Sequence, residues 1–213
     1  MRTAIILSSK KSTIPKKLRA NDNRYPEGLV KIFLNEYTKK GDSVFDPFAG
    51  LGTTLIVSEA MGRITYGIEL DKDRYNYIKS KLTNRKNIIC GSSLRLKDNK
   101  FPKFDFSMTS PPYNPIDEEN YLSGKGGYKG FIKDIGKIYS QLKRFMKKGS
   151  YIVIEVADVK KGKQLTPLPH DVTKEVSKIF HFEGKILVNW KNKKLDNRRI
   201  NYSHSYCLVF NNK

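Results

Sequence analysis

Cysteine is almost absent from the sequence, which has only Cys90 and Cys207 among 213 residues. The two lie far apart and in no CxxC or Cys/His cluster, which argues against a disulfide framework and a cysteine-based zinc site. We therefore expect no bound metal, and a reducing interior fits this composition best.

The sequence also has no long apolar run. The N-terminal stretch MRTAIILSSKK (1–11) contains one short apolar patch, too short for the core of a signal peptide. No other stretch is long enough to span a bilayer. The expectation is a soluble, cytoplasmic protein with no membrane partner.

Acidic residues are few: 21 Asp and Glu stand against 41 Lys and Arg, a formal net charge of +20. Such an excess favours a polyanionic partner, with nucleic acid first. A Lys-rich, well solvated surface is the alternative, because charge alone does not define a function. Basic clusters at 10–19, 160–163 and 191–199 are candidates for tracking phosphates.

Hydrophobic periodicity divides the chain into alternating strands and helices. Strands are predicted at 43–48, 64–70, 87–93, 104–110, 151–159, 185–190 and 205–210. Helices are predicted at 26–40, 54–62, 73–82, 131–148 and 171–180, with a long polar loop at 116–130. We expect a single α/β domain over 1–213, with a mostly parallel seven-stranded sheet and helices on both faces. Only a loop separates the last two strands, which should form an antiparallel pair at one edge.

The stretch DPFAGLGTT (46–54) joins a strand to a helix through two glycines. Gly50 and Gly52 allow a positive φ and a close approach of a ligand, while the free N–H groups of the new helix attract an anion or a carboxylate. Asp46 lies at the carboxyl end of the strand, where open α/β sheets bind ligands. The pattern is neither the GxGxxG of nicotinamide enzymes nor a phosphate loop.

The next strand ends in GIEL, which places Glu69 after a strand–helix–strand unit. A carboxylate there can accept hydrogen bonds from both hydroxyls of a ribose. The alternative is that Glu69 only neighbours a helix cap, for which Asp71 is the better candidate.

The hexapeptide TSPPYN (109–114) directly follows a strand. Because Pro-Pro continues neither a helix nor a ladder, a plain turn is one interpretation. A catalytic turn is the other, and the neighbouring motifs favour it.

In this order the motifs resemble those of the amino-group nucleic-acid methyltransferases, which modify N6 of adenine or N4 of cytosine. The similarity extends to YPEGLVKIFLNEY (25–37), VNWKNKK (188–194) and HSYCLVF (204–210), and so covers most of the chain. It implies a Rossmann-like methyltransferase fold with S-adenosylmethionine as cofactor. The residues assigned to the cofactor are Asp46, Pro47, Phe48, Gly50, Gly52, Thr53, Thr54, Glu69, Leu70, Asp71, Ser92 and Ser93.

Two features depart from this family. An acidic residue is common where this chain reads GSS (91–93), so Ser92 is expected to contact the adenine of the cofactor differently. Many relatives that act on DNA also carry a large recognition insert, for which this chain has no room. Long, stringent target sites are therefore not expected.

The SPPY motif suits an exocyclic amine, a poor nucleophile because its lone pair is conjugated into the ring. The Ser110 hydroxyl and the Pro111 carbonyl supply two acceptors for its two N–H bonds. Pro112 stiffens this clamp, and Tyr113 offers a flat face on which an extruded base stacks. A serine nucleophile in a hydrolase triad is the competing interpretation, but Pro111 replaces the glycine expected there.

The resulting hypothesis is methyl transfer to an exocyclic amine in double-stranded DNA. Cytosine N4 is favoured over adenine N6, since SPPY accompanies N4-cytosine activity more often in this family. The same chemistry on RNA and an inactive nucleic-acid-binding relative are the alternatives. A restriction endonuclease counterpart is compatible with the family, and the sequence leaves monomer and homodimer open. Trp190 is expected to pack at a strand end rather than read a base.

Overall fold

The computed structural model describes residues 2–19, 22–112, 122, 125–161, 164–191 and 204–213. The strands are β1 (Ala4–Ser8), β2 (Ser43–Asp46), β3 (Ile64–Glu69), β4 (Ile88–Cys90), β5 (Phe104–Thr109), β6 (Met146–Val156), β7 (Val159–Lys161), β8 (Gln164–Thr166), β9 (His181–Lys191) and β10 (His204–Asn211). The α-helices are α1 (Glu27–Tyr37), α2 (Thr53–Ala60), α3 (Lys72–Lys81), α4 (Gly127–Lys143) and α5 (Leu168–Val176). Short 3-10 helices are η1 (Lys16–Leu18), η2 (Arg85–Asn87) and η3 (Ser93–Asp98).

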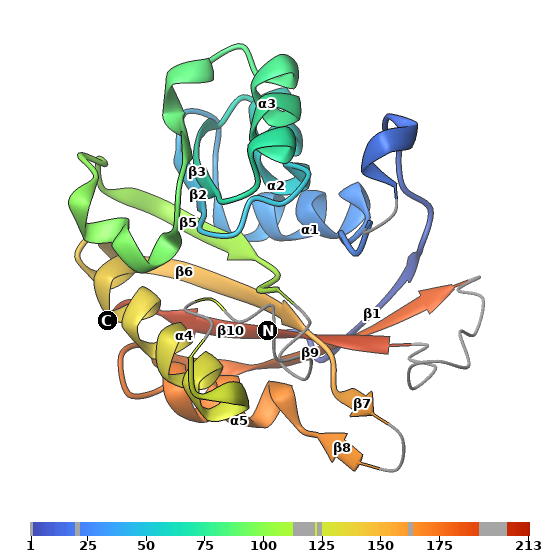
Figure 1. Ribbon diagram of the computed structural model, residues 1–213, viewed down its shortest axis with the longest axis vertical. Coiled ribbons are helices and arrows are strands. Elements are labelled where there is room, and N and C mark those ends of the chain that lie inside the picture. The colour runs from blue at the N-terminus through green and yellow to red at the C-terminus, as the bar shows by residue number, and fades with distance from the viewer. Residues whose placement is uncertain (1, 20–21, 113–121, 123–124, 162–163, 192–203) are drawn as a thin grey trace.

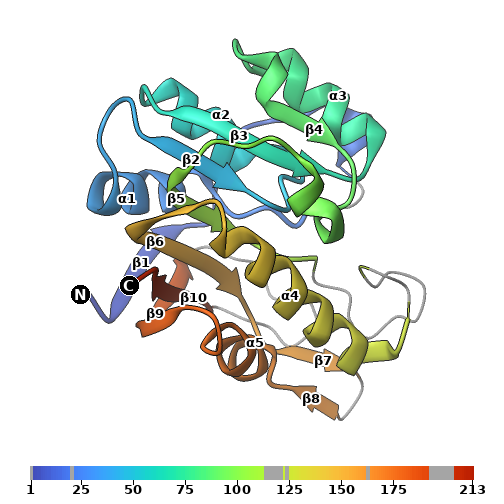
Figure 2. The same cartoon turned by 90° about the vertical axis from the view of Figure 1, so that its left-hand side faces the viewer.

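The main sheet has eight strands in the order β1-β9-β10-β6-β5-β2-β3-β4 (Figures 1 and 2). Strands β2 to β6 run parallel to one another, whereas β10 is antiparallel to both of its neighbours, β6 and β9. Strands β7 and β8 form a small antiparallel pair of their own, which the sequence pattern does not indicate. The predicted α/β architecture with a mostly parallel sheet is confirmed.

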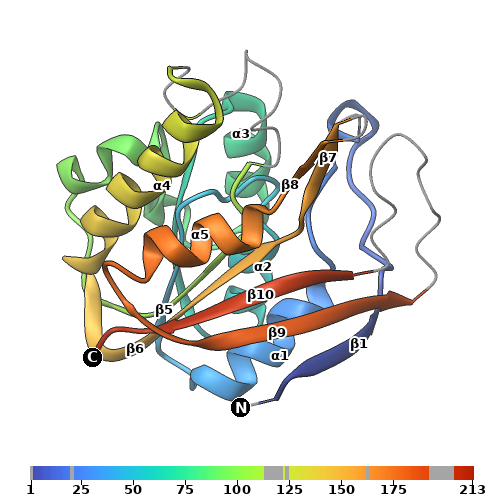
Figure 3. The same ribbon diagram turned by 90° about the horizontal axis from the view of Figure 1, so that it is seen from below.

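The edge of the sheet differs from the prediction. The apolar patch near the N-terminus forms β1, which pairs in parallel with β9, so the main sheet has eight strands rather than seven (Figure 3). The antiparallel pair β9–β10 is therefore not at the edge. Five residues, of which Ile5 is buried and Ile6 is exposed, give a weak local signal, and the strand is recognisable only through its distant partner.

Two apolar layers hold the helices against opposite faces of the sheet. Helix α1 packs through Leu29, Val30, Phe33 and Leu34 onto the face formed in part by Val44 and Phe106. The other face carries α4 and α5, whose buried side chains include Phe131, Ile135, Ile138, Leu142 and Val172. A third cluster joins α2 to α3 and contains Leu55 and Ile78. The helix spacing read from the sequence thus places the correct stripes inward.

Helix α4 begins earlier than predicted. Residues 116–130 were expected to form a loop, but Gly127 to Gly130 belong to the first turn of α4, preceded by Gly126 at a φ of 77°. Residues 116–121 and 123–124 lie outside the described part of the chain. Glycine is a poor helix former, so this start is fixed by burial of Phe131 further along the helix rather than by local propensity. No helix in the described part is long and apolar enough to cross a membrane.

Candidate cofactor and catalytic site

Three predicted motifs meet where the strands end, because neighbouring parallel strands have their carboxyl ends on the same side of the sheet. Asp46 ends β2, Glu69 ends β3, and Thr109 ends β5 immediately before Ser110. Strand β2 lies between β3 and β5 in the sheet. The glycine turn, the acidic strand end and the SPPY turn therefore adjoin one another, as expected for ligands of open α/β sheets.

The glycine turn has the geometry predicted from its sequence. Gly50 has a φ of 56° and Gly52 a φ of 77°, and Gly52 is the cap that precedes α2. A Cβ on Gly52 would lie 2.9 Å from Cγ1 of the buried Ile78, whereas one on Gly50 would meet only the Phe48 carbonyl oxygen, at 3.8 Å. Gly52 is thus required for packing against α3, and Gly50 borders open space.

Glu69 ties the glycine turn to the end of β3. Its Oε2 accepts from the Gly50 N–H at 2.6 Å, and its Oε1 accepts from the Asp71 N–H at 2.8 Å. Burial raises the pKa of Glu69, and these two N–H donors oppose the rise. Each carboxylate oxygen keeps a further acceptor position for a ligand. Asp71 caps α3 by accepting from the Arg74 N–H, as predicted, while Leu70 is 67% exposed beside them.

Asp46 is the most deeply placed carboxylate of the site. Its Oδ1 accepts from the Phe48 N–H at 2.9 Å and from the Thr109 hydroxyl at 2.6 Å. Burial raises the pKa of Asp46 to about 6, although these hydrogen bonds favour the ionised form. The carboxylate therefore changes charge near the lower end of the physiological range.

Of the two threonine hydroxyls at the start of α2, one is hydrogen-bonded and the other has no partner among the described residues. The Thr54 hydroxyl donates to the Met108 carbonyl at 3.3 Å and is hydrogen-bonded to the phenol of Tyr25. The Thr53 hydroxyl is buried and has no hydrogen-bond partner among the described residues.

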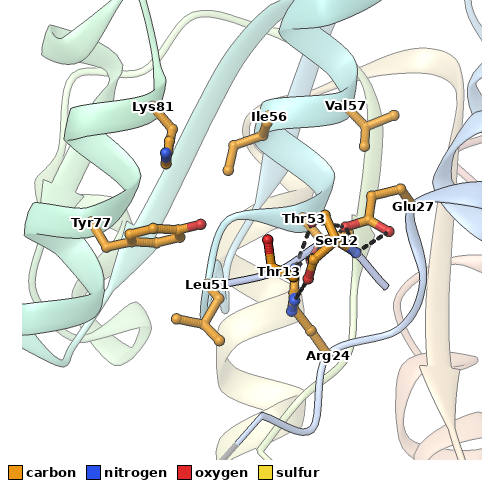
Figure 4. A pocket seen from close by; sticks show the side chains of 10 residues that line it. All are labelled: Ser12, Thr13, Arg24, Glu27, Leu51, Thr53, Ile56, Val57, Tyr77 and Lys81. Carbon is orange, nitrogen blue, oxygen red and sulfur yellow. Dashed lines mark hydrogen bonds and ion pairs between the residues drawn. The ribbon is translucent and has the colours of Figure 1, made fainter. Parts of the chain in front are cut away.

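Thr53 also lines a pocket of about 260 Å³ bordered by α2, α3 and the N-terminal segment, with Leu51, Arg24 and Tyr77 among the other lining residues (Figure 4). The strand-end carboxylates Asp46 and Glu69 do not line it. The pocket thus adjoins the glycine turn through Leu51 and Thr53 without including the strand-end carboxylates.

Ser92 and Ser93 lie next to the cofactor loop in different roles. The Ser93 hydroxyl donates to the Pro47 carbonyl and so fastens the loop to the start of η3. The Ser92 hydroxyl accepts from the Leu94 N–H at 3.3 Å and caps η3. Only a second lone pair or its own proton is left for a ligand.

The catalytic turn is described as far as Pro112. The Ser110 hydroxyl is buried, and it has no hydrogen-bond partner among the described residues. Pro111 is buried and Pro112 is exposed, while Tyr113 lies outside the described residues. The Ser110 hydroxyl therefore has a proton and lone pairs that no described residue uses.

Much of the basic surface named from the sequence lies where side chains are not described, including 160–163 and 192–199. Within 10–19, Lys16 and Lys17 are exposed. Trp190 is 8% exposed and donates from Nε1 to the Ser205 hydroxyl at 3.2 Å, so its predicted packing role is confirmed.

Comparison with known proteins identifies the family. A family model described as DNA methylase, of the N6 and N4 type, matches residues 5–80 and 104–213. The chain belongs to this DNA methylase family. S-adenosylmethionine is the methyl donor of the family, as predicted.

Curated relatives match over shorter stretches. The type II methyltransferase M.MthZI of Methanothermobacter thermautotrophicus is 40% identical over 67 residues, which cover 32% of this chain and 19% of the relative. M.BamHI of Bacillus amyloliquefaciens is 30% identical over 120 residues, 54% of this chain and 28% of the relative. The matched part of this chain thus spans under a third of these relatives' length.

Solved structures confirm the fold. TrmN from Thermus thermophilus superposes with a TM-score of 0.66 at 14% identity, covering 92% of this chain and 52% of that chain. An S-adenosylmethionine-dependent methyltransferase from Clostridium acetobutylicum gives a TM-score of 0.58 at 12% identity, covering 87% and 89%. The predicted Rossmann-like methyltransferase fold is confirmed.

Sequence reasoning missed three buried groups around Asp46. Thr109 donates to Asp46, and the phenols of Tyr25 and Tyr139 lie close enough for the Asp46 charge to raise their pKa values further, although burial is the main cause. Thr109 and Tyr25 are part of the TSPPYN and YPEGLVKIFLNEY stretches, but their spacing alone does not reveal a shared partner. Tyr139 carries no motif signal, because it reads as one more apolar position of a helix.

Proposed function

We propose that this chain is a DNA methyltransferase that transfers a methyl group from S-adenosylmethionine to an exocyclic amine, with N4 of cytosine preferred over N6 of adenine. The observation that carries the proposal is that the glycine turn, the Glu69 strand end and the SPPY turn adjoin at the carboxyl ends of β2, β3 and β5. The buried Ser110 hydroxyl there has no hydrogen-bond partner among the described residues. The relatives named as type II methyltransferases support DNA as substrate and a restriction–modification setting.

The strand-end residues fit the cofactor chemically. Glu69 has acceptor capacity for ribose hydroxyls, and the exposed Leu70 offers apolar surface to a purine. Asp46 is a carboxylate for the ammonium of the methionine part, and the first N–H groups of α2 suit its carboxylate. When bound, the cofactor supplies a methyl group on a positively charged sulfur.

The catalytic turn then acts on the target amine. Ser110 and Pro111 accept hydrogen bonds from its two N–H groups. These hydrogen bonds draw the lone pair of the amine nitrogen out of conjugation and direct it away from the turn. Proline suits this role because its carbonyl accepts while its own nitrogen has no N–H to compete. Once the new N–C bond forms, the surplus proton on nitrogen leaves through Ser110 or water, so no strong base is needed.

The product distinguishes the candidate substrates. After incubation with labelled S-adenosylmethionine and separate DNA and RNA, nucleoside mass spectrometry is expected to find N4-methylcytosine in DNA. N6-methyladenine alone would reject the cytosine assignment, and label confined to RNA would reject DNA. Methylation of a ring carbon or ring nitrogen would contradict the amine clamp itself.

Cofactor affinity should weaken as the pH falls through about 6, the value to which burial raises the pKa of Asp46. Above that pH Asp46 is a carboxylate that attracts the ammonium group of the cofactor. Below it the carboxylate is protonated, and the affinity should fall by up to about tenfold per pH unit. Calorimetry between pH 5 and 8 measures the effect. Asp46→Asn is the control, because it should bind weakly and with a flatter profile; identical profiles would contradict the assignment.

A further inference from the structure

One carboxylate oxygen connects the glycine turn to β5, the strand that leads into the SPPY turn. Oδ1 of Asp46 accepts both from the Phe48 N–H, inside the turn, and from the Thr109 hydroxyl, next to Ser110. Asp46 is 2% exposed and Thr109 is fully buried. The hydrogen bond from Thr109 to Asp46 is therefore shielded from water, which would otherwise compete for the same groups.

This connection lies where the backbone pairing of the two strands ends. Strands β2 and β5 pair in parallel through Val44 with Phe106 and through Phe45 with Ser107. Beyond that point the side-chain hydrogen bond from Thr109 to Asp46 joins them. On its other side β5 stays paired with β6 as far as Thr109, opposite Ile154.

A second hydrogen bond crosses the same gap. The Thr54 hydroxyl, in the first turn of α2, donates to the Met108 carbonyl at 3.3 Å. It is held there by the buried phenol of Tyr25. This bond involves the backbone of β5, whereas the bond to Asp46 holds the side chain next to the catalytic serine.

We propose that Thr109 is a positioning residue, which fixes Ser110 relative to the cofactor loop through its hydrogen bond to Asp46. The inference rests on the proposed function, because it assigns the two joined elements to the amine and to the methyl donor. Group transfer requires the reacting atoms within about 3–3.5 Å and in line, and a misplacement of about 1 Å can cost a hundredfold in rate. A buried bond between the two holding elements sets that distance before the substrates arrive.

The bond also affects the charge of Asp46. A donated hydrogen bond favours the carboxylate, so its loss should raise the pKa of Asp46 further. Glu69 is the charged group that raises the pKa of Asp46, and Asp46 in turn raises the pKa values of Tyr25 and Tyr139; a substitution at Thr109 changes none of these groups. Because burial is the main cause of the raised pKa, a loss of packing that admitted water would lower the pKa of Asp46, whereas loss of the hydrogen bond raises it. The direction of the shift therefore distinguishes the two causes.

Thr109→Val tests the proposal, because valine keeps the shape of threonine and replaces only the hydroxyl with a methyl group. We expect kcat to fall by about 10- to 100-fold, with the affinity for S-adenosylmethionine at pH 8 changed by less than about threefold. We also expect the pH below which the cofactor affinity falls to move to a higher value. Thr109→Ser should restore both properties, since it returns the donor.

Thr65→Val is the matched control, because Thr65 is equally buried and its hydroxyl has no partner among the described residues. That variant should leave kcat and the pH profile unchanged. Wild-type rates for Thr109→Val, or failure of Thr109→Ser to recover them, would overturn the positioning role. If the wild type methylates neither DNA nor RNA, the proposed function fails instead, and the pH profile of cofactor binding still decides whether Thr109 acts on Asp46.

Discussion

Gly50→Leu is expected to reduce the affinity for S-adenosylmethionine below the range of calorimetry while leaving the chain folded. Gly50 has a φ of 56°, and a Cβ there meets nothing closer than the Phe48 carbonyl oxygen, at 3.8 Å. A side chain would therefore extend into the open space beside the turn, which is where the proposal places the cofactor. The strained backbone conformation itself costs about 1–2 kcal/mol.

Gly41→Leu controls for that strain. Gly41 has a φ of 87° with nothing within 4 Å of a Cβ. It precedes the amino end of β2, whereas the proposed cofactor site lies at the carboxyl ends of the strands. The Gly41→Leu variant should lose a similar free energy of unfolding and keep its affinity for S-adenosylmethionine. Gly52 is a poorer test, because a Cβ there would lie 2.9 Å from Ile78 and disturb the packing of α3. If Gly50→Leu bound the cofactor as tightly as Gly41→Leu, the cofactor site would have to lie elsewhere.

Much of the site followed from the sequence because parallel strands end at one edge. The periodic apolar pattern located β2, β3 and β5, and the residues that follow such strands must converge once the sheet is parallel. The positive φ of Gly50 and Gly52 and the capping role of Asp71 were predicted for the same local reason. These features depend on a few neighbouring residues and not on the distant parts of the chain.

The remaining features depend on distant partners. Asp46 and Thr109 are separated by 63 positions, and only the packed sheet brings their side chains within a hydrogen bond. Strand β1 needs β9 to be recognised, and the pairing covers five residues. The Ser92 hydroxyl, assigned to the cofactor from the sequence, also caps η3, because Ser at a helix start satisfies a free N–H. The local pattern does not reveal this second role.

Ser110→Ala is expected to reduce methyl transfer by about 30- to 1,000-fold, the equivalent of about 2–4 kcal/mol for removal of one acceptor from the transition state. The hydroxyl is buried without a partner among the described residues, so its removal breaks no hydrogen bond seen in the fold. Unfolding temperature and cofactor affinity should therefore remain close to those of the wild type. Single-turnover rates with saturating cofactor measure the loss directly.

Ser107→Ala is the matched control within the same strand. Ser107 is fully buried and its hydroxyl also lacks a partner among the described residues, but it lies three positions before Ser110, inside the paired part of β5. Removing either hydroxyl leaves a void of the same size, so any shared effect on stability cancels. A hydroxyl that holds the amine must matter at Ser110 and not at Ser107. Equal rates for the two variants would show that the SPPY turn shapes the site without contributing its serine, whichever base is methylated.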